Sequence, residues 1–437
     1  MASDKDEQKE RQQRREAARK KRERERRLLI TRLVIAGVAL VFCGILIWYV
    51  SAGGRRAAQP DTPASTGTEP SAAPAATKAT TATEPQGETT VIHIAAAGDL
   101  NVTDKVIAAG KTTGGYDFTQ VFQDVAPVLS NADLAVVNFE GNLFGEPYGT
   151  DSASAPQELM EALASAGVDL VQMANSCAIR NGILGLSATL DGIRAAGMES
   201  VGAWATNSEF RESKGYTIRE VQGLRIAIVA FTKGMNNLGL PSGSENCVNL
   251  LYDDYATTYN DVASEKITRI LRDVAQEQPD FTIALLHWGS EYKEDISSTQ
   301  EDIQDLMLAQ GVDVIIGTHP HLVQKITWDQ EQGTLVAYSL GDFFGDGEKA
   351  GSNYSIILDL EITRDNVTGQ TRLTGYSYTP IYTIKPEESG DTGLRVLRIE
   401  QAMAAYEAGF LDRVTQAAYE NMAYALTRAD DRASGRG

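Results

Sequence analysis

The chain has 437 residues, enough for one large α/β domain with appendages or for two to three average domains. Its composition, 42% hydrophobic and 23% charged, is that of a globular protein. The formal net charge is −19, but residues 1–32 hold 13 Lys and Arg against 7 Asp and Glu (+6), which leaves −25 on the remainder. An acidic body of this kind argues against nucleic acid binding by the main domain. The three cysteines, Cys43, Cys177 and Cys247, match no known disulfide framework, although Cys177 and Cys247 could pair in an oxidising compartment.

A hydrophobic segment follows the basic tail. Leu33–Val50, LVIAGVALVFCGILIWYV, contains no charge and as a helix would span about 27 Å, close to the thickness of a bilayer core. We predict a transmembrane anchor over residues 33–52; the alternative is a cleaved signal peptide, whose hydrophobic region would be shorter. By the positive-inside rule, residues 1–32 form a cytoplasmic tail and the C-terminal bulk is extracellular, in a single-pass protein of the cell membrane. The other interpretation of the basic tail is a helix that binds nucleic acid.

Residues 57–90 are rich in Ala, Thr and Pro and contain no aromatic residue, so they predict a disordered linker. From residue 91 to about residue 430, apolar runs of strand length alternate with helical patterns. This alternation predicts an α/β domain with a sheet core covered by helices. The predicted strands are 91–99, 132–141, 168–176, 198–204, 224–232, 280–289, 312–319, 334–344, 354–363 and 371–384; the predicted helices are 155–167, 187–197, 298–311 and 396–409.

Polar residues fall at the carboxyl ends of several predicted strands. Open α/β sheets bind ligands along that edge, so a set of polar side chains there is a candidate site. The set consists of Asp99, Glu140, Asn175, His287, His319 and His321.

The segment Gly-Thr-His-Pro-His, residues 317–321, uses two of the four histidines of the chain. Two imidazoles close together after a strand suit a divalent metal, and the alternative is a pair of ordinary surface histidines. Taken singly, His287 could be a core histidine, Asp99 could cap a turn, and Glu140 could lie at the solvent rim. Together they form a mixed N/O set that suits Mn, Fe or Zn better than Mg or Ca, and such sites hydrolyse phosphoesters. The residues alone therefore predict a metal-dependent hydrolase of unknown substrate.

Six motifs, in combination and order, resemble the CapA family of bacterial poly-γ-glutamate capsule biosynthesis proteins, within the calcineurin-like metallophosphoesterases. They are AAGD (96–99), NFEG (138–141), GLSATLDGIRAAGMESVGA (185–203), LHWGSEY (286–292), GTHPH (317–321) and AYSLGDF (337–343). The resemblance covers roughly residues 91–384 and implies a two-layered β sandwich flanked by helices, with a metal site at the strand ends. It suggests that Asn138 and Asn175 contact the substrate. It also suggests that the metal ligands are Asp99, Glu140, His287, His319 and His321.

The sequence departs from the pattern of that family at one motif. Where the family reads Ala-Asn-Asn-His with an Asp three residues after the His, this chain has Ser176, Cys177 and Arg180. The resemblance implies that the lost Asn would bind metal and the lost His would help protonate a leaving group; loss of a general acid costs about 10²–10⁴-fold in rate. Cys177 could bind a soft metal, and Arg180 could hold an anionic group, so both are candidate catalytic residues. Asp342 also stands where the family usually has Asn.

These departures leave open whether the protein is an enzyme and whether it retains two metals, one or none. We expect a membrane-anchored extracellular protein that assists the synthesis, export or anchoring of an anionic capsule polymer such as poly-γ-glutamate, together with other capsule-synthesis membrane proteins. The alternative is an active metal-dependent phosphoesterase that acts on a cell-wall or nucleotide substrate. The acidic body conflicts with a polyanionic partner, since long-range repulsion slows encounter unless a bound cation or local basic residues offset it.

Overall fold

The computed structural model describes residues 88–436, apart from 391–392 and 411–413. The predicted tail and anchor, and nearly all of the predicted linker, lie outside the described residues. Within the described part of the chain, no helix combines the length and the apolar composition that a bilayer crossing requires.

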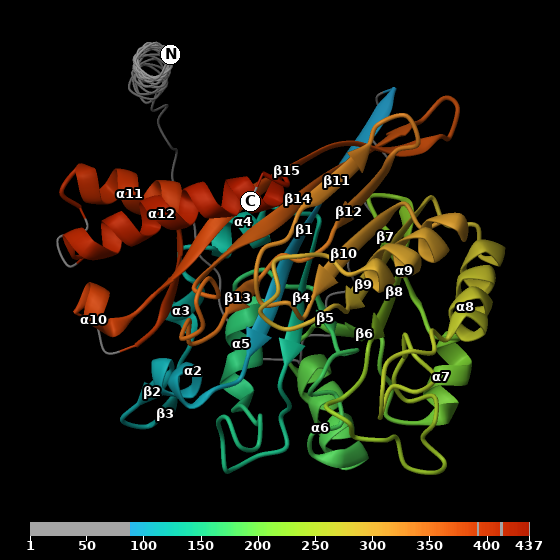
Figure 1. The fold of residues 1–437 in the computed structure, drawn as a ribbon, viewed down its shortest axis with the longest axis horizontal. Coiled ribbons are helices and arrows are strands. Elements are labelled where there is room, and N and C mark those ends of the chain that lie inside the picture. Colours follow the sequence, from blue (N-terminus) through green and yellow to red (C-terminus); the bar gives the residue numbers. More distant parts are fainter. Residues whose placement is uncertain (1–87, 391–392, 411–413, 437) are drawn as a thin grey trace, which may run out of the picture. The chain divides into compact units, whose positions relative to one another are not determined.

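Two mixed β-sheets form the centre of the domain (Figure 1). The first has the strand order β16-β15-β14-β1-β4-β5-β6, and β13 also pairs with β1. Its strands are β1 (Thr89–Asn101), β4 (Leu134–Glu140), β5 (Leu170–Gln172), β6 (Glu199–Val201), β13 (Asp342–Phe344), β14 (Tyr354–Asp365), β15 (Thr371–Ile384) and β16 (Arg395–Arg398).

The second sheet has the order β11-β12-β10-β9-β8-β7, and a separate small hairpin joins β2 to β3. The strands of the second sheet are β7 (Thr217–Val221), β8 (Leu224–Thr232), β9 (Phe281–His287), β10 (Val314–Thr318), β11 (Ile326–Asp329) and β12 (Thr334–Ala337); the hairpin is β2 (Lys111–Thr112) and β3 (Gly115–Tyr116).

Alternating side chains of β8 show how the layers are held. Ile226 and Ile228 join the large core that also contains the apolar residues of the first sheet, whereas Val229 and Phe231 face a second core. That second core is closed by apolar residues of the helices α8 and α9. Because both faces of β8 are buried, its residues 226–231 form a continuous apolar run and not a polar–apolar alternation.

Helices cover the outer surfaces of the sheets (Figure 1). The helices α11 and α12 pack on β14 and β15, and α8 and α9 flank the second sheet. The helices are α2 (Asp104–Ala109), α3 (Thr119–Phe122), α4 (Ala126–Ser130), α5 (Gln157–Ser165), α6 (Gly182–Ala195), α7 (Asn207–Ser213), α8 (Ser264–Gln276), α9 (Ser298–Ala309), α10 (Pro386–Ser389), α11 (Ile399–Glu407) and α12 (Gln416–Ala433).

The predicted α/β fold is confirmed, with helices around mixed sheets. Two predicted segments divide in the structure: 334–344 contains β12 and β13, which belong to different sheets, and 396–409 contains most of β16 and then α11. The core is shared by two sheets, as the resemblance implied, so residues from both sheets can reach one site.

Candidate metal centre

Parallel pairing brings the predicted residues to one edge. In β1 and β4, Asp99 is the register partner of Asn138, and Glu140 ends β4. In the second sheet, His287 ends β9 opposite Thr318, and His319 follows at once. The carboxyl ends of these parallel strands converge, as open α/β sheets predict.

The Gly-Thr-His-Pro-His turn has an unusual backbone. His319 has φ of 92° and His321 has φ of 59°, both in the left-handed region. A non-glycine residue there costs about 1–3 kcal/mol, which persists where the surrounding structure enforces it. Here the backbone N–H of His319 donates to Asp99 Oδ2 at 2.9 Å, and this bond ties the turn to β1. The strained turn therefore aims both imidazoles at the carboxylates.

One group of potential ligands, which we call the inner corner, consists of Glu140, His287 and His319; their ligand atoms lie within 4.8 Å of one another. Glu140 Oε1 is 2.7 Å from His287 Nε2, and the rings of His287 and His319 are 4.6 Å apart. Ser176, at the position of the lost Asn, has its Oγ 3.0 Å from His287 Nε2 and 3.5 Å from His319 Nδ1.

Glu140 supplies the observation that tests whether this group fits a cation. Its Oε1 is buried and makes no hydrogen bond with any described residue, because the approach of His287 Nε2 does not have hydrogen-bond geometry. A buried carboxylate oxygen without a donor is costly unless a cation or a proton satisfies it. The inner corner therefore fits a metal ion.

A second group, the outer corner, consists of Asp99, His321 and Asp342, and its ligand atoms also lie within 4.8 Å of one another. His321 Nδ1 is 2.8 Å from Asp342 Oδ1 and 3.7 Å from Asp99 Oδ2. The exposed Glu291 forms a third possible group with His319 and His321. The five predicted ligands thus gather in one place, but they divide between neighbouring groups.

Burial shifts the pKa values of these groups in different directions. Desolvation raises the pKa of Glu140 to about 7 and raises that of Asp99 well above its ordinary value, to which the charge of Glu140 adds. Desolvation lowers the pKa of His287 and of His319, so both are neutral imidazoles with a lone pair for a metal. For His321, desolvation opposes protonation, but the Asp342 carboxylate outweighs it and the pKa of His321 is raised.

Asn138 and Asn175 lie behind Asp99. Asn138 Nδ2 donates to Asp99 Oδ1 at 2.5 Å, and Asn175 Nδ2 donates to Asn138 Oδ1 at 3.1 Å and to the backbone carbonyl of Phe139 at 2.7 Å. Both are buried, and neither lines the cavity described below. In this geometry they orient Asp99, and their contact with substrate stays a prediction.

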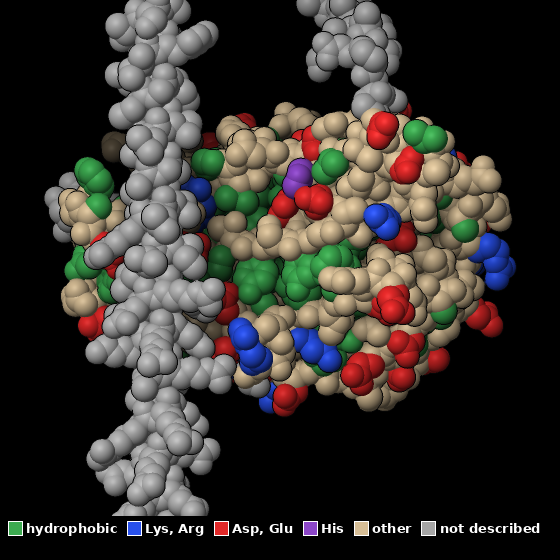
Figure 2. Space-filling view, turned by 90° about the horizontal axis from the view of Figure 1, so that it is seen from above, with side chains coloured by type: hydrophobic (Ala, Val, Ile, Leu, Met, Phe, Trp, Pro, Cys, Tyr) green, Lys and Arg blue, Asp and Glu red, His purple; other side chains and the backbone are tan. Residues whose placement is uncertain are grey.

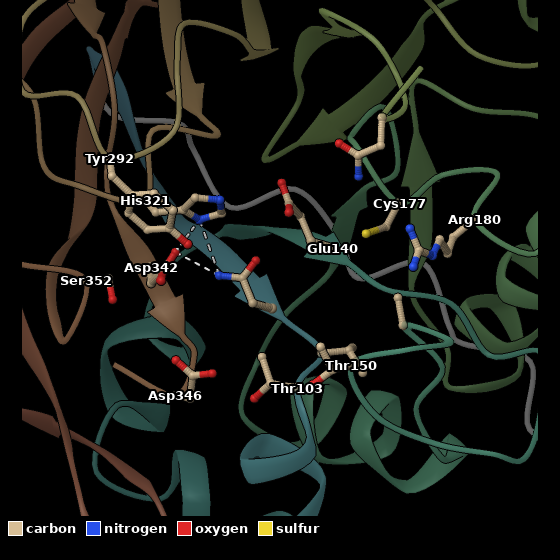
Figure 3. A pocket seen from close by; sticks show the side chains of 14 residues that line it. Thr103, Glu140, Thr150, Cys177, Arg180, Tyr292, His321, Asp342, Asp346 and Ser352 are labelled. Carbon is tan, nitrogen blue, oxygen red and sulfur yellow. Dashed lines mark hydrogen bonds and ion pairs between the residues drawn. The ribbon is translucent and has the colours of Figure 1, made fainter. Parts of the chain in front are cut away.

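A cavity of about 240 Å³ opens beside the outer corner (Figure 3). Its wall includes His321 and Asp342 on one side and Cys177 and Arg180 on the other, with Glu140 between them. Burial raises the pKa of the Cys177 thiol, so the sulfur is a protonated thiol at neutral pH, and neither Cys177 nor Cys247 forms a disulfide. Arg180 Nη2 donates to the carbonyl of Asp151 at 3.1 Å, which fixes the guanidinium at the rim of the cavity.

A family model described as bacterial capsule synthesis protein PGA_cap matches residues 93–346. The chain belongs to the PGA_cap family. It is 28% identical over 260 residues to the capsule biosynthesis protein CapA of Bacillus anthracis, covering 58% of this chain and 60% of that protein. It is 25% identical over 272 residues to the PGA biosynthesis protein CapA of Bacillus subtilis strain 168, covering 60% of this chain and 66% of that protein. The match therefore spans less than two thirds of either relative.

Among solved structures, the chain is similar to the calcineurin-like phosphoesterase YfkN from Bacillus subtilis, with a TM-score of 0.42 and 15% identity over 67% of this chain and 90% of that one. A likeness at this level says nothing about activity. The PGA_cap chain is thus a homologue of the CapA capsule biosynthesis proteins.

Three residues of this PGA_cap site were missing from the predicted ligand and contact set: Asn101, Asp342 and Tyr292. Asn101 Nδ2 donates to Asp342 Oδ1 at 2.8 Å, and the Tyr292 ring stacks on His321 with centroids 5.2 Å apart. The sequence carried a signal for Asp342, which stands where the family usually has Asn. It carried none for Asn101, whose role depends on a partner 241 residues away.

Proposed function

We propose that this protein is a membrane-anchored, extracellular CapA-type protein that assists the synthesis, export or anchoring of an anionic capsule polymer such as poly-γ-glutamate. Its outer domain would bind the polymer through a divalent cation held at the sheet edge. One observation carries the proposal: buried carboxylates and imidazoles of both sheets converge beside a cavity whose opposite wall bears Arg180.

The charges of the site support a bound cation. Asp99, Glu140 and Asp342 are all buried, and among the described residues they form ion pairs with His287 or His321 and with no Lys or Arg. Buried carboxylates need a counter-charge, and of the three imidazoles only His321 has a raised pKa, so a single protonated ring would face three carboxylates. Asp99, Glu140, His287, His319 and His321 would hold the ion, and Mn, Fe or Zn suits this mixed N/O set. When bound, such an ion neutralises and polarises an anionic group placed beside it.

The ion and Arg180 together address the conflict between an acidic domain and a polyanion. Acidic side chains are spread over the face seen in Figure 2, where Lys and Arg form no continuous patch. Attraction must therefore be local, within the roughly 8–10 Å over which charges act at physiological salt. Among the residues that the structure describes, Arg180 is the only Lys or Arg that lines the cavity, and its planar fork suits a carboxylate or phosphate.

The finer assignments rest on sequence features. The order of the motifs supports a calcineurin-like metallophosphoesterase fold, and the charge-free segment 33–50 after a basic tail supports the anchor and its topology. Membership of the family supports a capsule-synthesis context, and other membrane proteins of that process would be the partners.

Metal content and polymer binding of the purified full-length protein test the proposal. We expect metal analysis to find bound Mn, Fe or Zn, and calorimetry to detect poly-γ-glutamate oligomers only when the metal is present. His321→Ala should abolish that binding, whereas Arg194→Ala, on an exposed side chain paired with Asp191, should not. If the metal-loaded protein does not bind the polymer but hydrolyses phosphodiesters in a substrate panel, the phosphoesterase alternative is established instead.

A further inference from the structure

The loop of residues 290–296, between β9 and α9, contacts the His-Pro-His turn. The backbone N–H of Tyr292 donates to the carbonyl of Pro320 at 2.9 Å, and the Tyr292 ring stacks on His321 (Figure 3). The loop also carries Glu291, a member of the third possible ligand group. Because Tyr292 lines the 240 Å³ cavity as well, the position of this loop shapes both the ligand groups and the cavity wall.

The loop has little apolar contact with the rest of the domain. Residues 290–295 are all exposed, and of the loop only Ile296 packs against an apolar core. The buried Gln324 donates from its Nε2 to the carbonyls of Lys293, at 3.0 Å, and Asp295, at 3.4 Å. A segment with few buried apolar contacts opens readily unless polar contacts hold it, so contacts of this kind must fix the loop.

A second set of polar contacts reaches the loop from the helix α12. Arg428 Nη2 lies 3.3 Å from Glu294 Oε2, and Arg432 Nη2 forms an ion pair with Glu294 Oε1. The Arg432 side chain is 7% exposed and that of Arg428 is 26% exposed, so solvent screens the Arg432 pair less. The helix α12 follows the residues 93–346 that the family model matches, so this support for the site comes from outside the matched region.

Burial of Arg432 is costly for the fold. Its Nε and Nη1 are buried and form no hydrogen bond with any described residue, and its guanidinium lies 5.5 Å from the centroid of the Tyr354 ring. Buried N–H groups without an acceptor reduce stability, although the aromatic ring and the carboxyl end of α12 both favour a cation. Among the described residues, the charged partner of this guanidinium is Glu294. The packing of α12 does not explain a buried charge here, whereas the contact with the loop supplies a reason for it.

We propose that Arg432 is a positioning residue of the metal centre, which acts through Glu294 to hold the 290–296 loop against the His-Pro-His turn. With the ion pair intact, Tyr292 stays stacked on His321. Without it the loop opens, His321 loses its stacking partner and the cavity loses part of its wall. The effect on metal binding rests on the proposed function, whereas the effect on the loop does not.

Arg432→Met in the full-length protein tests this, because Met retains apolar packing and removes the charge. We expect an unchanged or higher melting temperature, since an apolar side chain in place of a buried ionic one is often neutral or stabilising, and the half-exposed Glu294 keeps Arg428. Hydrogen exchange at the Tyr292 amide should become about tenfold or more faster. Mn²⁺ affinity, followed by electron paramagnetic resonance, should fall by about tenfold. A purely structural role would lower the melting temperature instead.

Two further variants complete the test. Arg436→Met is the matched control, because the exposed Arg436 side chain pairs with Asp431, and it should change neither exchange in the loop nor Mn²⁺ affinity. Glu294→Gln removes the same ion pair from its exposed side and decides the question if Arg432→Met does not fold. We expect Glu294→Gln to speed exchange in the loop and to weaken Mn²⁺ binding.

The outcomes separate this inference from the proposed function. If neither Arg432→Met nor Glu294→Gln speeds exchange in the loop, or if exchange rises equally throughout the domain, Arg432 does not position the loop and the proposed function stands. If the loop loosens but Mn²⁺ binds as before, Arg432 is no positioning residue of the metal centre. If the unchanged protein binds no Mn²⁺, the metal part of the proposed function fails, and exchange alone decides whether Arg432 holds the loop.

Discussion

Asp99 and Asp342 are register partners on adjacent parallel strands, and both carboxyls are buried. Desolvation raises the pKa of each above its ordinary value. A carboxyl whose pKa is higher in the folded state binds its proton more tightly there, so ionisation reduces stability as the pH rises from the unfolded pKa to the folded one. The folded protein is therefore more stable when these two carboxyls are protonated than when both are ionised.

Asp342→Asn should therefore raise the melting temperature of the metal-free protein at pH 7 and above. The gain should disappear near pH 3, below the ordinary Asp pKa of about 3.9, because the acid and the amide are then both neutral. Calorimetry across this pH range measures it. A lower melting temperature at every pH would mean that the bond to His321 dominates instead.

Metal affinity should rise with pH through about 7, the pKa of Glu140. Below that pH a metal must displace the proton of Glu140, so affinity falls by up to about tenfold per pH unit. The Glu140→Gln variant should bind the metal more weakly, and its metal affinity should depend less steeply on pH, because the amide has no proton to lose. His321 and Asp99 titrate in both proteins and Glu140 raises the pKa of each, so the difference between the variants reports Glu140 together with its effect on these two groups. Identical slopes in Mn²⁺ titrations would exclude Glu140 as a ligand.

Arg180→Ala should weaken binding of poly-γ-glutamate oligomers to the metal-loaded protein by about 10–100-fold, since a hydrogen bond to a charged group contributes about 1.5–3 kcal/mol. Arg180→Asp should weaken it further by repulsion. Metal content should not change, because Arg180 lies across the cavity from the ligand groups. Equal affinity in Arg180→Ala and in the Arg194→Ala control would remove Arg180 from the polymer site.

The double substitution Ser176→Asn with Cys177→His should create or increase phosphodiester hydrolysis in the presence of Mn²⁺. Ser176 already contacts His287 and His319, so an amide at that position reaches the same ion. Restoring a general acid is expected to raise the rate by about 10²–10⁴-fold. If the metal-loaded double variant hydrolyses none of the phosphodiesters tested, the pocket has changed at more than these two residues.

Gly98→Ala should destabilise the protein by about 3 kcal/mol or more and lower its metal affinity. A Cβ at Gly98 would lie 1.8 Å from the carbonyl oxygen of Gly341, which also accepts the backbone N–H of Asp99. Gly114→Ala is the matched control, because nothing lies within 4 Å of its Cβ position. Urea unfolding measures both, and a tolerated Gly98→Ala would mean that β1 and β13 separate easily.

The local pattern predicted most strands of the two sheets and most of the candidate ligands, but it did not predict the helices α8 and α12 or the strand β7. Apolar runs predicted the positions of β8, β9 and β10, because strands buried on both faces are largely apolar. Polar residues that end such runs were correctly placed at one edge, since parallel strands share that edge. The sequence by itself therefore determined which side chains stand at the carboxyl ends of strands.

Tertiary structure decided how those side chains are grouped. The separation of β12 from β13, the pairing of Asp342 with Asp99 and the contact of Asn101 with Asp342 all depend on register between distant segments. Register is set by the packing of a whole sheet and leaves no periodic trace in the chain. The amino-acid sequence determined the set of potential metal ligands, and only the folded sheets determined that these ligands divide into an inner and an outer corner.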